Sequence, residues 1–294
     1  HPALKRRGYQ APGLFTCFPG EKLEKWDKWV QMRREQGFPL EIWSPQAVKS
    51  RYPKLATDAI EAAVYSPRDR QIQPIPLTQA LVDAARGNGV RFEFGATVMD
   101  AEVTNAEMEV PETRHCRTLI YKDIYKETQH HTTDWVVLSA GLGSTPFSQV
   151  LREPVTIQPV LGQALELAID LPSDYPVVTA HDVHLVSAAE GRAWVGATVE
   201  FPDAKGYVVS NPSLLQTLKS EAAQFYPELA MAEVRRQWQG LRPRPVDRSA
   251  PVIETLPGYH NVLLATGHYR NGVLLAPATA EAVCMLLLNS YSAI

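Results

Sequence analysis

The sequence predicts a mixed α/β protein, and two observations carry this prediction. A helical segment at 77–86 lies between strand-like segments at 62–65 and 90–94, which gives the order strand, helix, strand. Two apolar runs, at 135–143 and 261–266, are followed by glycine-containing turns, as buried parallel strands are. With 294 residues, of which 45% are hydrophobic, the chain can bury a substantial core.

The first third of the chain is expected to contain short elements whose ends are marked by capping residues, prolines and glycines. Ser44 followed by Pro45 is typical of a capped helix start, and Gly87 with Gly89 is typical of a helix end. In chain order we expect a strand at 13–18, a helix at 21–36, a short helix from Pro45, a strand at 62–65, a loop at 66–76, a helix at 77–86 and a strand at 90–94 leading to Thr97 and Val98.

The remaining two thirds are expected to be richer in strands. The stretch 102–131 is polar and has no sustained period, so it predicts a hairpin. After it we expect strands at 135–143, 163–169, 184–187 and 193–199, a helix at 212–225 capped by Ser210 or Asn211, strands at 234–239 and 261–266, and a long apolar helix at 273–289.

Composition narrows the functional class. The net charge of −3, without a long basic stripe, argues against a nucleic-acid partner. Three cysteines form no disulfide framework, so a reducing, cytoplasmic location is expected. The apolar runs are interrupted well before the roughly 20 residues that span a bilayer, so no membrane span is expected. His181 and His184 would point to opposite faces of a strand, and no metal site is predicted.

The run from Val262 to Pro277 is the strongest candidate for a ligand site. It joins a buried strand to a buried helix through a turn that Gly267 and Gly272 bracket. The start of the helix offers unpaired N–H groups and a positive dipole end, which suit an anion or an electron-rich oxygen. Glycines can also serve only to permit a turn, but the turn itself is densely polar: His268, Tyr269, Arg270, Asn271.

This run resembles the C-terminal signature of the FAD-dependent glycine oxidases and their D-amino-acid oxidase relatives. The resemblance implies that the turn and the helix start cover the pyrimidine end of FAD, where the dipole would stabilise negative charge on the reduced ring. The residues that it assigns to the cofactor here are Gly267, His268, Asn271, Gly272, Val273 and Leu274.

A second motif, Gly240-Leu-Arg-Pro243, is similar to the segment whose arginine holds the substrate carboxylate in this family. The planar guanidinium of Arg242 suits bidentate carboxylate binding, although an arginine after a strand often forms only a surface ion pair. Arg270 would be a second cation at the same pocket, or else a structural salt bridge. His184 lies one position away from a substrate-binding tyrosine of glycine oxidase and is the third substrate-binding candidate.

A third motif, at 134–143, is similar to a later strand of the family's flavin domain, which places Ala140 and Gly141 beside the dinucleotide. Val98 matches the position whose backbone meets the adenine. The resemblance implies an FAD-binding Rossmann-like domain interleaved with an antiparallel-sheet substrate domain. The expected substrate-domain segments are 1–73 and 159–240, and the expected FAD-domain segments are 74–158 and 241–294.

The function that the resemblance implies is oxidative deamination of glycine or a related small amino acid or amine, with O2 as acceptor and H2O2 as product. No side chain is assigned as a catalytic base, because FAD would carry the redox chemistry. The alternatives are a sarcosine or D-amino-acid dehydrogenase and a flavin-free, catalytically silent fragment. The latter arises because the resemblance starts near residue 13 and the 294 residues contain no G-x-G-x-x-G, so an N-terminal flavin segment is expected to be missing. A homo-oligomer is compatible with these observations.

Overall fold

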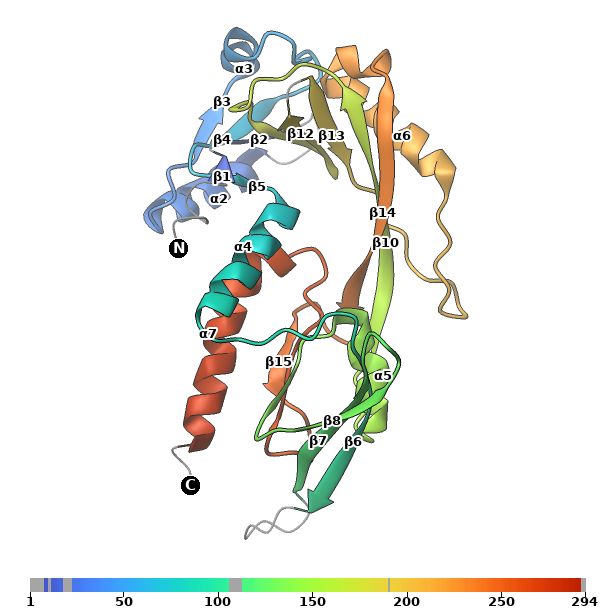
Figure 1. Ribbon diagram of the computed structural model, residues 1–294. Coiled ribbons are helices and arrows are strands. Elements are labelled where there is room, and N and C mark those ends of the chain that lie inside the picture. The colour runs from blue at the N-terminus through green and yellow to red at the C-terminus, as the bar shows by residue number, and fades with distance from the viewer. Residues whose placement is uncertain (1–7, 10–11, 18–22, 106–112, 190, 292–294) are drawn as a thin grey trace. The chain divides into compact units, whose positions relative to one another are not determined.

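The computed structural model describes residues 8–9, 12–17, 23–105, 113–189 and 191–291 (Figure 1). The chain divides into two compact units. The first comprises residues 1–88, 161–200 and 209–240, and the second comprises residues 89–160, 201–208 and 241–294. The prediction of a mixed α/β fold is confirmed, since sheets and helices occur in both units.

An eight-stranded sheet has the order β14-β10-β13-β12-β11-β2-β4-β3, and β10 and β14 each continue from one unit into the other. β13 pairs antiparallel with β10 and β12, β11 with β12, and β4 with β2 and β3, whereas β11 and β2 are parallel. The strands are β2 (Gly13–Cys17), β3 (Glu41–Trp43), β4 (Ala62–Ser66), β10 (Ile157–Ala168), β11 (Val177–Ala180), β12 (Val183–Ala189), β13 (Arg192–Gly196) and β14 (Val234–Pro245). A separate two-stranded sheet pairs β1 (Gly8–Tyr9) with β5 (Gln71–Ile72).

Helix α6 (Pro212–Phe225) packs on β12 and β13 and closes the main core of the first unit. Its buried side chains recur at helical spacing, at Leu215, Leu218, Ala222 and Phe225, so one face of the helix lies against the sheet. The other helices of this unit are α2 (Leu23–Glu35), α3 (Pro45–Arg51), α4 (Pro74–Gly87) and the 3₁₀ turn η2 (Pro227–Ala230).

The second unit contains two three-stranded sheets, in the orders β15-β16-β9 and β6-β7-β8. In the first of these, β9 and β16 are parallel, and β15 is antiparallel to β16. The elements are β6 (Thr97–Asn105), β7 (Arg114–Lys122), β8 (Thr128–Thr132), β9 (Val136–Leu138), η1 (Gly141–Gly143), α5 (Ser144–Val150), β15 (Val252–Thr255), β16 (Val262–Thr266) and α7 (Gly272–Tyr291).

Asn261 joins the two sheets of the second unit. Its buried side-chain amide donates to the carbonyl oxygens of Cys116, at 2.7 Å, and Asp134, at 2.9 Å. Its Oδ1 accepts from the Cys116 N–H at 2.9 Å. Three bonds from one side chain therefore fix β7 beside the starts of β9 and β16.

Several predicted elements are confirmed, most sharply the capped starts of α3 and α6. Ser44 caps α3 by accepting from the Ala47 N–H at 3.2 Å, and Asn211 caps α6 by accepting from the Ser213 N–H at 3.1 Å. The hairpin expected within 102–131 is part of the antiparallel β6-β7-β8 meander.

Other predictions are wrong. Residues 90–94 form no strand, although they alternate in polarity, because Val90 and Phe94 are exposed and do not bury an apolar face against a sheet. Consequently the helix at 77–86 does not lead into a parallel strand. That helix also starts earlier than expected, at Pro74, because a proline is well suited to the first helical position. β11 and β15 were not expected.

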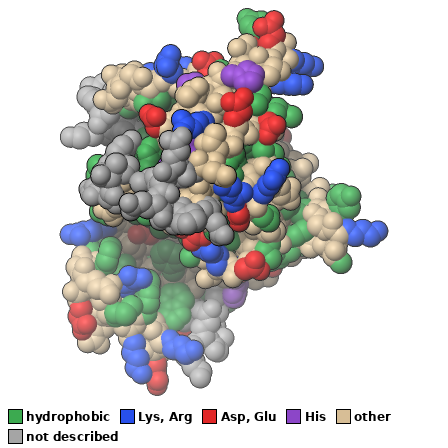
Figure 2. Space-filling view, turned by 90° about the horizontal axis from the view of Figure 1, so that it is seen from below, with side chains coloured by type: hydrophobic (Ala, Val, Ile, Leu, Met, Phe, Trp, Pro, Cys, Tyr) green, Lys and Arg blue, Asp and Glu red, His purple; other side chains and the backbone are tan. Residues whose placement is uncertain are grey.

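Helix α7 is long and apolar enough to cross a membrane, judged by length and composition alone. It runs through 20 residues, which is more than the interrupted apolar runs suggested, and the described residues bury little of it. A single helix of this kind is weak support for a membrane span, so the expectation of none stays a prediction. On the face shown in Figure 2, positive and negative side chains of the described residues are interspersed.

Candidate functional site

A cavity of about 590 Å³ lies in the second unit, where the parallel strands β9 and β16 end. Parallel strands place their carboxyl ends at one edge of the sheet, which is where α/β proteins commonly bind ligands. Small and apolar side chains form most of its wall, which suits a flat ring. Its lining residues are Val137, Ser139, Gly141, Pro243, Ala265, Thr266, Gly267, His268, Tyr269, Gly272, Ala276, Thr279, Ala280, Val283 and Cys284.

Two hydroxyl groups link the end of β16 to the turn and the helix that follow β9. The buried Ser144 Oγ donates to Thr266 Oγ1 at 2.9 Å, and Thr266 Oγ1 donates to the Gly141 carbonyl oxygen at 3.2 Å. Gly141 has φ +57°, a conformation that a glycine adopts without strain. The predicted cofactor residue Gly141 therefore lines the cavity, and Ala140 directly precedes it in the turn.

The turn after β16 is held against the end of β14. Gly267 has φ +74°, and a Cβ at this position would lie 2.6 Å from Pro245 Cγ, so only glycine fits. The Tyr269 N–H donates to the Pro243 carbonyl oxygen at 2.9 Å. Tyr269 itself has φ +51°, which is uncommon for a residue with a side chain.

Asn271 sets the start of α7. Its N–H donates to the His268 carbonyl oxygen, and its own carbonyl accepts from the Leu275 N–H, both at 2.9 Å. The N–H groups of Gly272, Val273 and Leu274 belong to the first helical turn, which has no acceptors within the helix. The Val273 and Leu274 side chains are exposed, and neither residue lines the cavity.

His268 is fixed inside the cavity wall. Its Nε2 lies 2.8 Å from Oγ1 of the buried Thr279, one of the two being the donor. Burial lowers the pKa of His268 below its ordinary value, because the charged imidazolium would lose solvation. His268 is therefore neutral at neutral pH and forms part of the shape of the cavity.

Arg242 lies on β14, one residue before Pro243 of the cavity wall, and is half-buried. Burial lowers the pKa of Arg242 most, nearby Arg270 lowers it further, and nearby Tyr269 raises it. The structure thus brings Arg242, Tyr269 and Arg270 into one electrostatic neighbourhood beside the cavity. Both arginines directly adjoin residues that line the cavity, Arg242 next to Pro243 and Arg270 next to Tyr269.

The other predicted site residues are not among those that line this cavity. Val98 lies on β6, opposite Tyr121, and does not line the cavity. His184 lies on β12 of the first unit, with Nδ1 2.9 Å from Thr179 Oγ1. His181 lies in the turn between β11 and β12, with φ +53°. The described residues contain no group of three His, Cys, Asp or Glu side chains able to hold a metal ion.

The sequence-based assignment included Gly272 but missed the rest of the face of α7 that lines the cavity. Ala276, Thr279, Ala280 and Val283 follow Gly272 by four, seven, eight and eleven residues, which places them on one face of a helix. That spacing of small residues is visible in the sequence and could have identified this wall. These side chains are small and uncharged, so this face of α7 leaves room for a flat group.

Comparison with known proteins agrees with this geometry. Residues 3–286 match the FAD dependent oxidoreductase family. The bifunctional protein ThiO/ThiG of a Nostoc species is 30% identical over 97% of this chain and 40% of its own length. The glycine oxidase of Pseudomonas putida is 37% identical over 53% of this chain and 42% of its own length. The chain thus spans less than half the length of these curated relatives.

A solved structure shows the same fold. The glycine oxidase of Geobacillus kaustophilus superposes with a TM-score of 0.76 at 22% identity, over 96% of this chain and 72% of that one. The cavity also fits the family's cofactor, since it combines small apolar walls for a flat ring with the N-terminus of a 20-residue helix for electron-rich oxygens. The chain belongs to the family of FAD-dependent oxidoreductases.

Proposed function

We propose that this chain oxidises the C–N bond of glycine or a related small amino acid or amine, giving an imine that water then hydrolyses. The observation that carries the proposal is the position of Arg242 and Arg270 beside a cavity suited to a flat cofactor. The names of the relatives support it, because two of those matched are a glycine oxidase and a ThiO/ThiG protein.

FAD, when bound, supplies the two-electron acceptor for this chemistry. Within the proposal, the backbone of Gly272, Val273 and Leu274 would hold its pyrimidine end, and the turn residues Gly267, His268 and Asn271 would shape that end of the site. The helix dipole of α7 favours negative charge there. Ala140 and Gly141 would lie beside the dinucleotide, and Val98 beside the adenine.

Arg242 would hold the substrate carboxylate through paired N–H···O bonds, with Arg270 as a second cation. This grip would orient the Cα–H bond, and orientation alone can contribute a large part of a rate enhancement. The substrate amine must be uncharged for a hydride to leave its Cα, and a neutral His268 would not protonate that amine. We assign no side chain as general base, and His184 remains a proposed donor to the carboxylate.

The test is to titrate the purified chain with FAD and assay the complex with glycine, sarcosine and D-alanine. Oxidised flavin absorbs at about 450 nm, so FAD binding can be followed by absorbance and turnover can be assayed separately. Peroxide formation with glycine supports the proposal. A complex that reduces an artificial electron acceptor but makes no peroxide indicates a dehydrogenase. A chain that takes up no FAD is the catalytically silent alternative and refutes the proposal for these 294 residues.

The location of the protein and its domain boundaries are separate proposals. We propose a cytoplasmic protein, because three cysteines without a disulfide framework suit a reducing compartment. Fractionation of cells into soluble and membrane pools tests this directly, and recovery of the chain in the membrane pool would contradict it. The domain division at 73, 158 and 240 is likewise proposed, and limited proteolysis near these positions would test it.

A further inference from the structure

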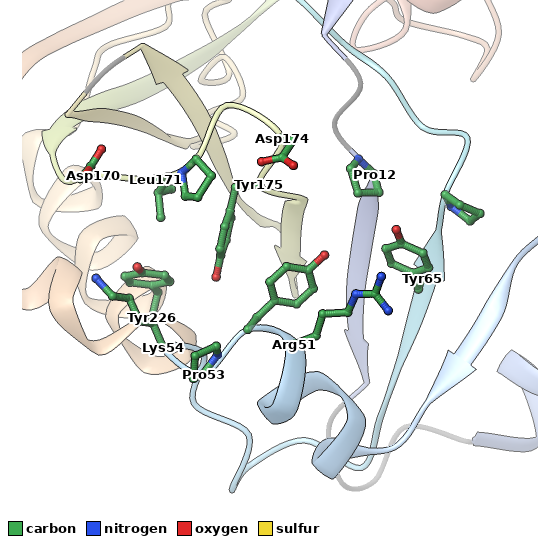
Figure 3. Close-up of a pocket in the computed structure, with 13 residues that line it drawn as sticks. Pro12, Arg51, Pro53, Lys54, Tyr65, Asp170, Leu171, Asp174, Tyr175 and Tyr226 are labelled. Atoms are coloured by element: carbon green, nitrogen blue, oxygen red, sulfur yellow. The ribbon is translucent and has the colours of Figure 1, made fainter.

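A second pocket, of about 700 Å³, lies in the first unit (Figure 3). It is formed by the segment after α3, the segment before β11 and the end of α6. Its volume falls in the range of roughly 300–1,000 Å³ that is usual for small-molecule sites. None of its lining residues lines the cavity beside Arg242.

The wall of this pocket is aromatic. The ring centroids of Tyr52 and Tyr175 are 5.3 Å apart, and those of Tyr175 and Tyr226 are 6.3 Å apart, both in edge-to-face geometry. Tyr65 continues the wall on the other side, where its ring stacks on Trp43 at 4.1 Å. Aromatic rings in such an array leave faces and edges that favour another aromatic ring.

The buried hydroxyl of Tyr175 has no hydrogen-bond partner among the described residues, whereas that of Tyr226 lies near the Lys54 ammonium. Tyr175 is 9% exposed and Tyr226 is fully buried. Burial raises the pKa of both hydroxyls, so both stay protonated and can donate. Figure 3 shows the two side chains reaching into the same space from different elements. Since unpartnered buried polar groups are costly and rare, a ligand that offers a polar tip at this point would stabilise the pocket.

The rim of the pocket carries charges of both signs. Arg51, at the end of α3, and Lys54 supply positive charge, although Lys54 also pairs with Glu228 at 3.0 Å. Asp170 and Asp174, which precede β11, supply negative charge. A rim with both signs around an aromatic wall complements a small zwitterion with an aromatic side chain.

We propose that this pocket is a second binding site, and that its ligand is a free aromatic amino acid. The ring of the ligand lies against the tyrosines, its carboxylate faces Arg51 and its ammonium faces Asp174. The polar tip of a ligand such as tyrosine meets the Tyr175 hydroxyl after a small shift of side chains. The inference does not rest on the proposed oxidase activity, because it uses none of the residues of that site.

Calorimetric titration of the intact chain with L-tyrosine tests the proposal. We expect a Kd below about 1 mM. Two analogues that each lack one charge, 3-(4-hydroxyphenyl)propionate and tyramine, are expected to bind at least about tenfold more weakly, because each leaves one side of the rim unpaired. Arg51→Gln is expected to weaken the binding of L-tyrosine to a similar extent. Lys28→Gln, on the exposed surface of α2, is expected to leave the Kd unchanged.

Two further variants make the result specific. Tyr175→Phe removes only the unpartnered hydroxyl, so we expect it to fold and to abolish the preference for L-tyrosine over L-phenylalanine. Arg242→Ala is expected to leave L-tyrosine binding intact, which distinguishes this pocket from the proposed substrate site. The proposal is overturned if wild type shows no binding, or if binding is lost in Arg242→Ala and kept in Arg51→Gln.

Discussion

Gly267 is the residue whose replacement tests the geometry of the cavity most sharply. Its φ of +74° disfavours any L side chain, and a Cβ there would lie 2.6 Å from Pro245 Cγ and 3.1 Å from Pro245 Cδ. A residue with a side chain costs about 1–2 kcal/mol in the left-handed region. Forcing an extra carbon into packed surroundings costs roughly 1–3 kcal/mol more, and the rigid proline ring cannot rotate away. We therefore expect Gly267→Ala to destabilise the protein by about 2–5 kcal/mol.

The matched control is Gly206→Ala. Gly206 also has a left-handed backbone, with φ +85°, but nothing lies within 4 Å of the position of its Cβ. It should show only the backbone cost of about 1–2 kcal/mol. Urea unfolding followed by tryptophan fluorescence measures both free energies, provided that the two variants keep the same slope against urea. If Gly267→Ala costs no more than Gly206→Ala, the close approach of this turn to β14 is not what fixes the cavity.

Three further predictions concern residues of the second unit. Arg242→Lys should raise KM for glycine by roughly 10- to 100-fold in steady-state assays, because a point charge replaces a bidentate fork; an unchanged KM would remove Arg242 from the substrate site. Thr266→Val should cost about 1–3 kcal/mol in urea unfolding, because it leaves the buried Ser144 hydroxyl without its acceptor; Ser144→Ala combined with it should cost little more, and a fully additive loss would show that the two hydroxyls act separately. Burial lowers the pKa of His268, and burial with His260 and Arg117 nearby lowers that of His115. The unfolded chain therefore binds more protons just below pH 6.5, so stability should be full above that pH and fall on acidification; a urea midpoint equal at pH 7.5 and pH 5.5 would contradict this.

Local signals in the sequence predicted the helix starts, because one or two residues determine a cap. Ser44 and Asn211 each supply a side-chain oxygen to the first turn, and each precedes a proline whose missing N–H costs nothing there. The strand at 261–266 was equally clear, since β16 is buried along its whole length.

Elements that depend on distant partners were harder to predict. Residues 90–94 alternate like a strand but form none, and the apolar side chains of Val90 and Phe94 stay exposed. β15 was missed because its four residues mix buried and half-exposed side chains, and its pairing with β16 is a property of the fold. The same reason applies at the site. The sequence indicated Arg242 and the turn at 267–271 separately, but the Tyr269 to Pro243 hydrogen bond that brings them together depends on an uncommon backbone conformation at Tyr269.

The central claim is that Arg242 and the cavity beside it form one site for an amino-acid carboxylate and FAD. Anaerobic mixing of the FAD-loaded chain with glycine, followed by absorbance near about 450 nm, tests both parts in a single turnover. We predict that the wild-type absorbance bleaches, and that Arg242→Ala binds FAD with unchanged affinity but bleaches at least about 100-fold more slowly at the same glycine concentration. Equal bleaching rates in the two proteins would contradict the account.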